Sequence, residues 1–373
     1  MAGCLLLSGC APGGGLVCGG TPSGGWSGPV VANDTIYVGT MDGRVIAINP
    51  SSRIAGYPFP SVGEWSFSFG GGVGGGFLSC APAAVVSIYG TPAVADGVVY
   101  IGTGNGKLYA LDATAGYDIW QYPRDGYIGS IVGSPVVADG ILYIGSSDGK
   151  LYAIDIETRN LKRDFETGGE IWGTPLVHDG VVYIGSADHK LYALDAESGE
   201  EVWDTPFVTG GAIAATPLIY NDTIYIGSFD RNFYALNLDG TPKWEKPFSA
   251  GNWFWGKAVA YGDIIIVGCL DHKIYALDAE SGAEAWPPYE TGGPIRGDPV
   301  LLGDLVIFGS EDGKVYALEA ATGVERWQRD LESPILASIY AGDGVVYVHA
   351  TNQKNYALET EHGNVLWSVS PSK

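Results

Sequence analysis

The chain has 373 residues, of which 42 are acidic and 20 are basic, so its formal net charge is −22. An acidic chain of this kind is repelled by nucleic-acid phosphates and anionic membrane surfaces, which argues against both as partners and leaves basic and neutral partners open. Only 17% of the residues are charged and 57 are glycine, a composition typical of short strands joined by tight turns.

Residues 1–25 lie outside the pattern of the rest of the chain and are interpreted as a leader. The segment Leu6–Cys10 resembles a bacterial lipobox, whose cysteine becomes lipid-modified, and the glycine-rich residues 11–15 would form a tether. No Lys or Arg precedes Cys10, and the apolar run is shorter than a usual signal core, so a chance match is the alternative. The lipobox predicts export with a lipid anchor at Cys10. No stretch approaches the roughly 18 apolar residues of a spanning helix.

The stretch Gly180–Trp203, GVVYIGSADHKLYALDAESGEEVW, displays the repeating unit of the chain. Two runs rich in β-branched and aromatic residues, 181–184 and 190–194, predict a β-hairpin. The matching hairpins elsewhere carry pairs such as Asp148-Gly149, which favour a type I′ turn because both of its central residues take positive φ. One strand before this hairpin and one ending at Trp203 complete a unit of four antiparallel strands.

The unit occurs eight times. The tyrosine of its first hairpin strand, or an aliphatic replacement, falls at Tyr37, Tyr100, Tyr143, Tyr183, Tyr225, Ile266, Ile307 and Tyr347. Four-stranded units that repeat every 40 to 45 residues or so are the signature of a β-propeller. We therefore expect an all-β fold, a single eight-bladed propeller over residues 26–369 with four-stranded antiparallel blades, and a short tail at 370–373. The first and last units are each complete, so the ring is expected to close without strand exchange.

A tryptophan closes the outer strand in most units. These residues are Trp120, Trp203, Trp244, Trp286, Trp327 and Trp367. We expect each ring to cover the seam between two blades rather than to form a site, because buried aromatic rings dominate core packing. Tyr57 and Arg163 take this position in the first and third units, which predicts weaker seams there.

Residues 57–87 are interpreted as a glycine-rich insertion between the first and second units. Its run 70–76 is almost entirely glycine, with aromatic residues around it. The insertion is either a mobile lid or partner-contact arm, or a disordered segment, and the sequence favours neither. It is not a nucleotide-binding loop, because no GK[ST] motif follows the glycines.

The five cysteines offer little chemistry. Cys4 precedes the lipobox, and Cys10 would carry the lipid. Cys18 and Cys80 are candidates for a disulfide if the protein is exported, although the sequence cannot establish the pairing. Cys269 stands where other units have serine and is expected to be a buried small residue.

The pattern Tyr-x-Gly, five residues, Leu-Tyr-Ala-Leu-Asp, then Gly and Trp resembles the pyrroloquinoline-quinone-type propeller repeat over residues 26–367. It is seen in Tyr183–Gly185, Leu191–Asp195, Gly199 and Trp203. The resemblance implies the fold but not one function, because the family includes quinoprotein dehydrogenases, the propeller lipoprotein of the outer-membrane β-barrel assembly machine and other envelope proteins. Many quinoprotein dehydrogenases carry adjacent cysteines beside the cofactor. This sequence has no Cys-Cys pair, no Cys-x-x-Cys-His haem site and no assignable calcium ligands, so the enzyme interpretation is disfavoured.

The residues just before each innermost strand are expected to converge on the central axis. Three residues before the repeated proline position stand Trp26, Tyr89, Val132, Trp172, Ala214, Trp255, Arg296 and Leu336. These eight positions differ between units while the residues around them repeat, which suggests that they determine which ligand or partner is bound. The aromatic members would stack on a peptide strand, a sugar or a flat ring, and Arg296 would bind a carboxylate. The alternative is that the rings plug the channel, since inward positions of a propeller must be filled.

Other residues near the axis complete the candidate site. Directly before the repeated proline position most units carry a hydroxyl residue, whereas two adjacent units carry Lys257 and Asp298, interpreted as an internal ion pair rather than as acid and base. Trp253 is expected to be exposed and is a further binding candidate. His189 and His272 are interpreted as turn residues that tolerate positive φ. The remaining histidines show no metal-ligand spacing, so no metal site is predicted.

These features predict a non-catalytic binding or assembly scaffold of the bacterial cell envelope. We expect a monomeric, exported, lipid-anchored propeller that presents its surface to protein partners and needs no cofactor. The competing hypotheses are an alcohol or sugar dehydrogenase dependent on pyrroloquinoline quinone and Ca²⁺, and a carbohydrate-binding propeller.

Overall fold

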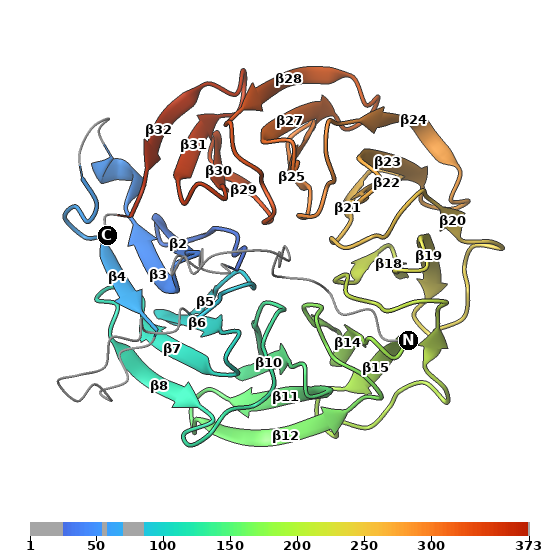
Figure 1. Cartoon of the computed structure of the whole chain (residues 1–373). Coiled ribbons are helices and arrows are strands. Elements are labelled where there is room, and N and C mark those ends of the chain that lie inside the picture. The colour runs from blue at the N-terminus through green and yellow to red at the C-terminus, as the bar shows by residue number, and fades with distance from the viewer. Residues whose placement is uncertain (1–24, 54–57, 70–85, 372–373) are drawn as a thin grey trace, which may run out of the picture.

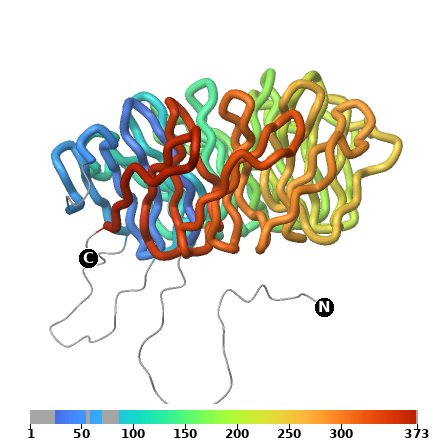
Figure 2. Tube along the Cα trace, turned by 90° about the horizontal axis from the view of Figure 1, so that it is seen from above, coloured from blue at the N-terminus to red at the C-terminus, as the bar shows by residue number. Residues whose placement is uncertain are grey.

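The computed structural model describes residues 25–53, 58–69 and 86–371. Within these residues, thirty-two strands form eight four-stranded sheets in which the strands follow one another in sequence order. The sheets stand radially around a central axis (Figure 1), and the view turned by 90° shows them side by side in a flat ring (Figure 2). The predicted eight-bladed, all-β propeller is therefore confirmed.

The strands of the first four blades, with one short 3-10 helix, have the following bounds. They are β1 Val30–Ala32, β2 Thr35–Gly39, β3 Arg44–Ile48, η1 Pro50–Ser52, β4 Trp65–Ser68, β5 Ala93–Ala95, β6 Val98–Gly102, β7 Leu108–Asp112, β8 Asp118–Tyr122, β9 Val136–Ala138, β10 Ile141–Gly145, β11 Lys150–Asp155, β12 Asn160–Glu166, β13 Leu176–His178, β14 Val181–Gly185, β15 Lys190–Asp195 and β16 Phe207–Val208.

The last four blades repeat this order. Their strands are β17 Leu218–Tyr220, β18 Thr223–Gly227, β19 Asn232–Asn237, β20 Phe248–Ser249, β21 Val259–Tyr261, β22 Ile264–Gly268, β23 Lys273–Asp278, β24 Glu284–Glu290, β25 Val300–Leu302, β26 Leu305–Gly309, β27 Lys314–Glu319, β28 Glu325–Asp330, β29 Tyr340–Gly342, β30 Val345–His349, β31 Asn355–Glu359 and β32 Val365–Val369.

The core of each blade lies in its two middle strands. In the fourth blade β14 and β15 are almost wholly buried, and Tyr183 pairs opposite Ala193, so the small residue faces the large one across the ladder. The innermost strands have only three residues each and are half-buried, because one of their faces lines the central channel. Residues that precede the innermost strands are thus held at the axis by rigid sheets.

The first and middle hairpins of a blade use different turns, and the predicted location of the type I′ turn is wrong. In six blades both central residues of the turn between the first and second strands have positive φ, as at Asp179 (47°) and Gly180 (74°), whereas in the sixth and seventh blades only Gly262 and Gly303 do. In the middle hairpin only the last loop residue has positive φ, such as His189 at 74°. That loop has four residues, and Asp188 stabilises it by accepting hydrogen bonds from the Lys190 N–H and the Tyr192 hydroxyl. The interpretation of His189 and His272 (73°) as turn residues is confirmed.

Four of the six closing tryptophans are buried against the next blade, as expected, whereas Trp120 and Trp367 are only partly buried. Trp203 lies on Gly240 of the next blade and donates its Nε1–H to the Leu238 carbonyl at 2.9 Å. Trp244, Trp286 and Trp327 make the same contact at 3.1, 3.2 and 2.8 Å. In the fourth and fifth blades the outer strand begins after this tryptophan rather than ending at it.

The first blade corrects the sequence analysis. Trp65, and not Tyr57, pairs opposite Ala47 and donates its Nε1–H to the Ala113 carbonyl at 3.0 Å. The outer strand β4 therefore lies inside the stretch 57–87 that was interpreted as an insertion, and the seam after the first blade is not weakened. Tyr57, residues 70–85, Cys18 and Cys80 lie outside the described residues, as does the leader with Cys10.

In the third blade Arg163 pairs opposite Ala153, as predicted. Its side chain lies on Gly199 of the next blade, where other blades place the tryptophan ring. The Nη1 atom of Arg163 is buried and has no hydrogen-bond partner in the described part of the chain. A partly unsatisfied guanidinium replaces a packed ring there, which supports the expectation of a weaker seam.

The ring closes between complete first and last blades, without strand exchange. The first and last blades lie side by side in both views (Figures 1 and 2). In the other seven blades a glycine ends the second strand, and an isoleucine or phenylalanine of the next blade packs against it, as Ile213 does on Gly185. At the closure His349 replaces this glycine, Gly25 stands at the isoleucine position, and His349 Nδ1 lies 3.1 Å from the Ser27 carbonyl oxygen. The buried imidazole therefore links the last blade to the first.

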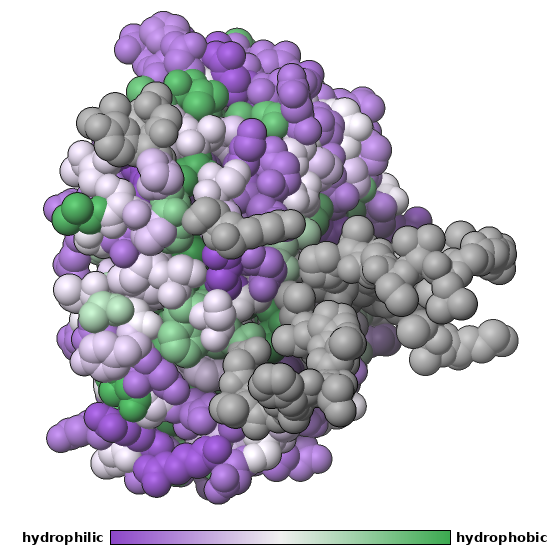
Figure 3. Space-filling view, turned by 60° about the vertical axis from the view of Figure 1, so that its left-hand side comes forward, coloured by the Kyte–Doolittle hydropathy of each residue, from purple (hydrophilic) through white to green (hydrophobic). Residues whose placement is uncertain are grey.

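Some large hydrophobic side chains are more than half exposed, for example Tyr117 and Val324. On the side seen in Figure 3, hydrophobic residues form small separate groups among hydrophilic ones. No helix among the described residues has the length and apolar character needed to cross a bilayer.

Candidate functional site

The residues just before each innermost strand surround the central axis, and we call this region the hub. Backbone contacts between adjacent blades hold the hub together. The glycines two residues before the repeated proline position touch the next blade closely: a Cβ on Gly133 would lie 2.4 Å from the Gly173 carbonyl oxygen. One residue further along, the Thr91 N–H donates to Ser134 Oγ and the Ser134 N–H donates to Thr174 Oγ1, both at 2.9 Å. A hydroxyl at the axis therefore fixes each of these blades to the next.

The predicted ion pair between Lys257 and Asp298 is wrong. Asp298 Oδ1 accepts a hydrogen bond from the backbone N–H of Lys257 at 2.6 Å, and the Asp298 N–H donates to Ser338 Oγ at 3.1 Å. The carboxylate thus takes the place of the hydroxyl in the hub ring, and the Lys257 ammonium is not within ion-pair distance of it. Burial raises the pKa of Asp298, which follows from the cost of placing a charge at the crowded axis.

The aromatic candidates converge at one mouth of the channel. Trp26 lies 4.7 Å from Tyr89 and 6.2 Å from Trp255, measured between ring centroids, with edge-to-face geometry. Trp172 lies 6.3 Å from Phe229, which stacks on Trp253 at 4.5 Å with an interplanar angle of 9°. We call these six residues the aromatic mouth: Trp26, Tyr89, Trp172, Phe229, Trp253 and Trp255.

Trp253 forms the outer end of the aromatic mouth and is 37% exposed. Phe229 connects it to the hub, because its ring also stacks on Trp255 at 5.3 Å. Aromatic surface therefore runs without a break from the axis to the solvent, which is the arrangement expected of a contact surface for a partner.

Arg296 lies beside the aromatic mouth but is already paired. Its Nη2 is 3.0 Å from Glu311 Oε1, and its Nε–H donates to the same oxygen at 3.1 Å. Its guanidinium carbon lies 5.0 Å from the Trp255 ring centroid and 5.7 Å from that of Trp26. We expected Arg296 to bind the carboxylate of a ligand. In the structure the carboxylate of Glu311 already compensates the charge of Arg296.

The rings narrow the channel without filling it. A cavity of about 220 Å³ lies between Trp26, Tyr89, Trp172 and Trp255 and is also lined by Ser130, Val132, Ser147 and Glu170. A smaller space of about 90 Å³ continues toward the hub hydroxyls. Beyond the hub, a wider space of about 540 Å³ is lined by inner strands of the last four blades. The rings constrict the axis, as a plug would, and they still leave room for a side chain, as a binding site would. The structure is therefore compatible with both hypotheses from the sequence.

Sequence reasoning missed three residues of this region. Glu170 occupies the position two residues before the aromatic hub residue of its blade, as Trp253 does in its own. Phe229 and Glu311 occupy the first variable position of the middle hairpin loop, whose backbone N–H bonds to the segment before the hub in the Phe229–Ala212 and Glu311–Pro294 contacts. The same comparison of units that identified the hub residues, applied to these two positions, would have found them.

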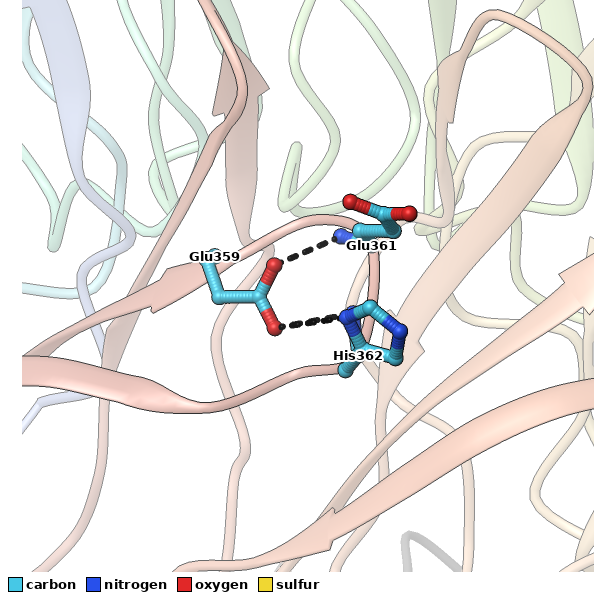
Figure 4. Close-up of side chains that lie close together, drawn as sticks. All are labelled: Glu359, Glu361 and His362. Atoms are coloured by element: carbon cyan, nitrogen blue, oxygen red, sulfur yellow. Dashed lines mark hydrogen bonds and ion pairs between the residues drawn. The ribbon is translucent and has the colours of Figure 1, made fainter.

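Two other places in the fold carry side chains that are able to react or to bind a metal ion. Glu359, Glu361 and His362 lie together in the turn between β31 and β32, close enough for a shared metal ion (Figure 4). Glu359 instead caps the turn by accepting the N–H groups of Glu361 and His362. Although partial burial acts in the opposite direction, these hydrogen bonds hold the pKa of Glu359 below its usual value. The hydrogen bonds of the turn are therefore sufficient to explain why these three side chains lie together.

Cys269 is fully buried, as expected, and its thiol contacts the Asn252 carbonyl oxygen at 3.3 Å. Burial raises the pKa of this thiol to about 12, so it is not a reactive nucleophile in the folded protein.

The fold and the hub positions define an eight-bladed propeller built from pyrroloquinoline-quinone-type repeats. The family model described as "Outer membrane protein assembly factor BamB" matches residues 64–171, 162–288 and 270–373, and the chain therefore belongs to this family.

Solved structures agree on the fold. The computationally designed Ika8 protein is 14% identical with a TM-score of 0.73, covering 90% of this chain and 96% of its own. BamB from Moraxella catarrhalis is 20% identical with a TM-score of 0.68, covering 87% and 91% respectively. A comparison with curated protein sequences finds no match.

The aromatic mouth is poorly suited to pyrroloquinoline quinone, which is a tricarboxylate. Among the described residues, Arg296 is the one guanidinium at the mouth and is paired with Glu311, and Glu170 is the only charged residue that lines the cavity of 220 Å³. Ligand pockets usually have volumes of roughly 300–1,000 Å³. These residues therefore do not fit the quinone.

Proposed function

We propose that this propeller is a non-catalytic scaffold of the bacterial cell envelope that binds a protein partner at the aromatic mouth. The observation that carries the proposal is the continuous aromatic surface from Trp26 at the axis to Trp253 in solvent. Exposed aromatic side chains that converge on a cavity are the usual anchors of protein interfaces. Membership of a family described as an outer membrane protein assembly factor supports the same role.

The test is partner capture by purified protein from detergent-solubilised envelope, quantified by mass spectrometry. The double substitution Trp172→Ala and Trp255→Ala should reduce capture at least about 30-fold, because even one central aromatic anchor contributes roughly 2 kcal/mol or more. Tyr117→Ala is the matched control, since Tyr117 is an aromatic residue 58% exposed on the outer surface.

Circular dichroism should show that the double variant keeps its strand content. An unchanged capture profile in this folded variant would remove the proposal. Binding of glycans on an array, or dye reduction after addition of pyrroloquinoline quinone and Ca²⁺, would instead support the carbohydrate-binding or the dehydrogenase hypothesis.

We also propose that Cys10 carries a lipid that anchors the propeller to the membrane, with residues 11–15 as its tether. The segment Leu6–Cys10 supports this proposal by its similarity to a lipobox. The wild-type protein should incorporate labelled palmitate and sediment with membranes, and Cys10→Ala should abolish both. Membrane association that persists without label in the wild type would contradict the proposal.

A further inference from the structure

The charges around the aromatic mouth determine which kind of partner group it accepts. Within the part of the chain that the structure describes, Arg296 is the only basic residue that lines the axis beside the rings. Glu311 holds it in an ion pair, and both side chains are about a quarter exposed. An incoming carboxylate would have to compete with Glu311 for the guanidinium. The mouth is therefore not built for an anion.

On the outer side of the rings, the only charged residue that lines the cavity in residues 25–53, 58–69 and 86–371 is acidic. Glu170 is exposed, and its carboxylate makes no ion pair within the described part of the chain. Ser130 and Ser147 add hydroxyl groups to the same wall. A group that enters between the four rings thus meets π faces, two hydroxyls and one free negative charge.

We infer that the aromatic mouth binds an arginine side chain presented by the protein partner. The faces of Trp and Tyr attract cations, and a guanidinium also stacks on them through its planar shape. Arg296 provides an internal precedent, because its guanidinium already lies 5.0 Å from the Trp255 centroid and 5.7 Å from that of Trp26. A carboxylate beside such rings adds a charge-assisted hydrogen bond.

The size of the cavity and the charge of the chain favour the same occupant. A volume of about 220 Å³ accommodates a single long side chain and lies below the roughly 300–1,000 Å³ of small-molecule pockets. The net charge of −22 attracts a basic partner over long range and raises the rate of encounter. The inference rests on the proposed function, since it specifies the chemistry of the partner.

The experiment compares two capped five-residue peptides, one with arginine at its centre and one with citrulline, the neutral urea analogue of the same shape. Binding to the full chain is measured by titration calorimetry at low salt. We expect the arginine peptide to bind about tenfold more tightly than the citrulline peptide. Equal binding of the two peptides, or tighter binding of the same peptide with glutamate at its centre, would overturn the inference.

Two substitutions locate the effect. Glu170→Gln keeps the shape of the side chain and should weaken the arginine peptide several-fold at low salt, with a smaller difference at high salt because the charge is screened. Glu157→Gln is the control, because Glu157 is exposed in the turn between β11 and β12. It should leave binding unchanged, and an equal loss in both variants would mean that only net charge matters, contrary to the inference.

The outcome separates this inference from the proposed function. If arginine and citrulline peptides bind alike while Trp172→Ala with Trp255→Ala still reduces partner capture, the mouth binds a protein but not through arginine. If capture does not depend on these tryptophans, the proposed function fails as well.

Discussion

Replacement of Trp203 by alanine should destabilise the propeller by about 4 kcal/mol. The indole is 7% exposed, covers Gly240 of the next blade and donates a hydrogen bond to the Leu238 carbonyl. Burying roughly 150–250 Å² of aromatic surface at about 25 cal/mol per Å² gives roughly 4–6 kcal/mol, near the 3–5 kcal/mol typical of such truncations. Trp203→Phe keeps a ring but leaves the carbonyl without its donor, and should cost about 1–3 kcal/mol.

Trp120→Ala provides the matched comparison. Trp120 is only partly buried, its ring nitrogen donates no hydrogen bond within the described residues, and Arg159 with φ of 60° stands at the glycine position of the facing turn. Its removal should cost about 2 kcal/mol, half the effect at Trp203. Equilibrium urea unfolding followed by circular dichroism measures both. Equal losses for the two alanine variants, or a loss below about 1 kcal/mol at Trp203, would refute the account of the seams.

Three further predictions concern single buried groups. Burial lowers the pKa of His349 from its ordinary value of 6.5. Below pH 6.5 the unfolded chain therefore binds a proton at this residue that the folded state resists. The urea midpoint should decrease when the pH is lowered from about 7.5 to about 5, and it should decrease less in His349→Gln. Cys269, with its raised pKa of about 12, should resist iodoacetamide at pH 8 until the protein unfolds, as peptide mass spectrometry can verify; rapid labelling at that site would oppose this. Asp298→Ser should unfold within about 1 kcal/mol of wild type because it restores a hub hydroxyl, whereas Asp298→Ala should lose about 1–3 kcal/mol, and similar midpoints for the two would count against the hub hydrogen bond.

The repeat period was sufficient to predict the fold and the convergence of Trp26, Tyr89, Trp172 and Trp255, because each residue keeps its place in a rigid sheet that occurs eight times. The first blade was misassigned because additional residues separate its third and fourth strands, and the regular spacing then points to Tyr57 instead of Trp65. Spacing identifies a position only where the loops between strands keep their length.

Pairing between side chains was harder to predict. Lys257 and Asp298 have opposite charges on adjacent blades, yet the carboxylate bonds to the backbone, because the hub geometry directs this position at the N–H of the preceding blade. The partner of Arg296 is Glu311, fifteen residues away in a hairpin loop. The sequence is sufficient to predict which residues face the axis. It is not sufficient to predict the partner of each side chain, because partners such as Glu311 lie in loops whose turn type was predicted incorrectly.

The most direct test of partner binding at the aromatic mouth is site-specific photo-crosslinking in intact envelope. A photoreactive amino acid replaces Trp253, which is 37% exposed at the outer end of the mouth, or Val324, which is 57% exposed in the turn between β27 and β28. We predict a discrete protein adduct from position 253 that is missing from position 324 and is lost when Trp172 and Trp255 are also replaced by alanine. No adduct at position 253, or the same adducts at both positions, would contradict the claim that the mouth is the binding surface.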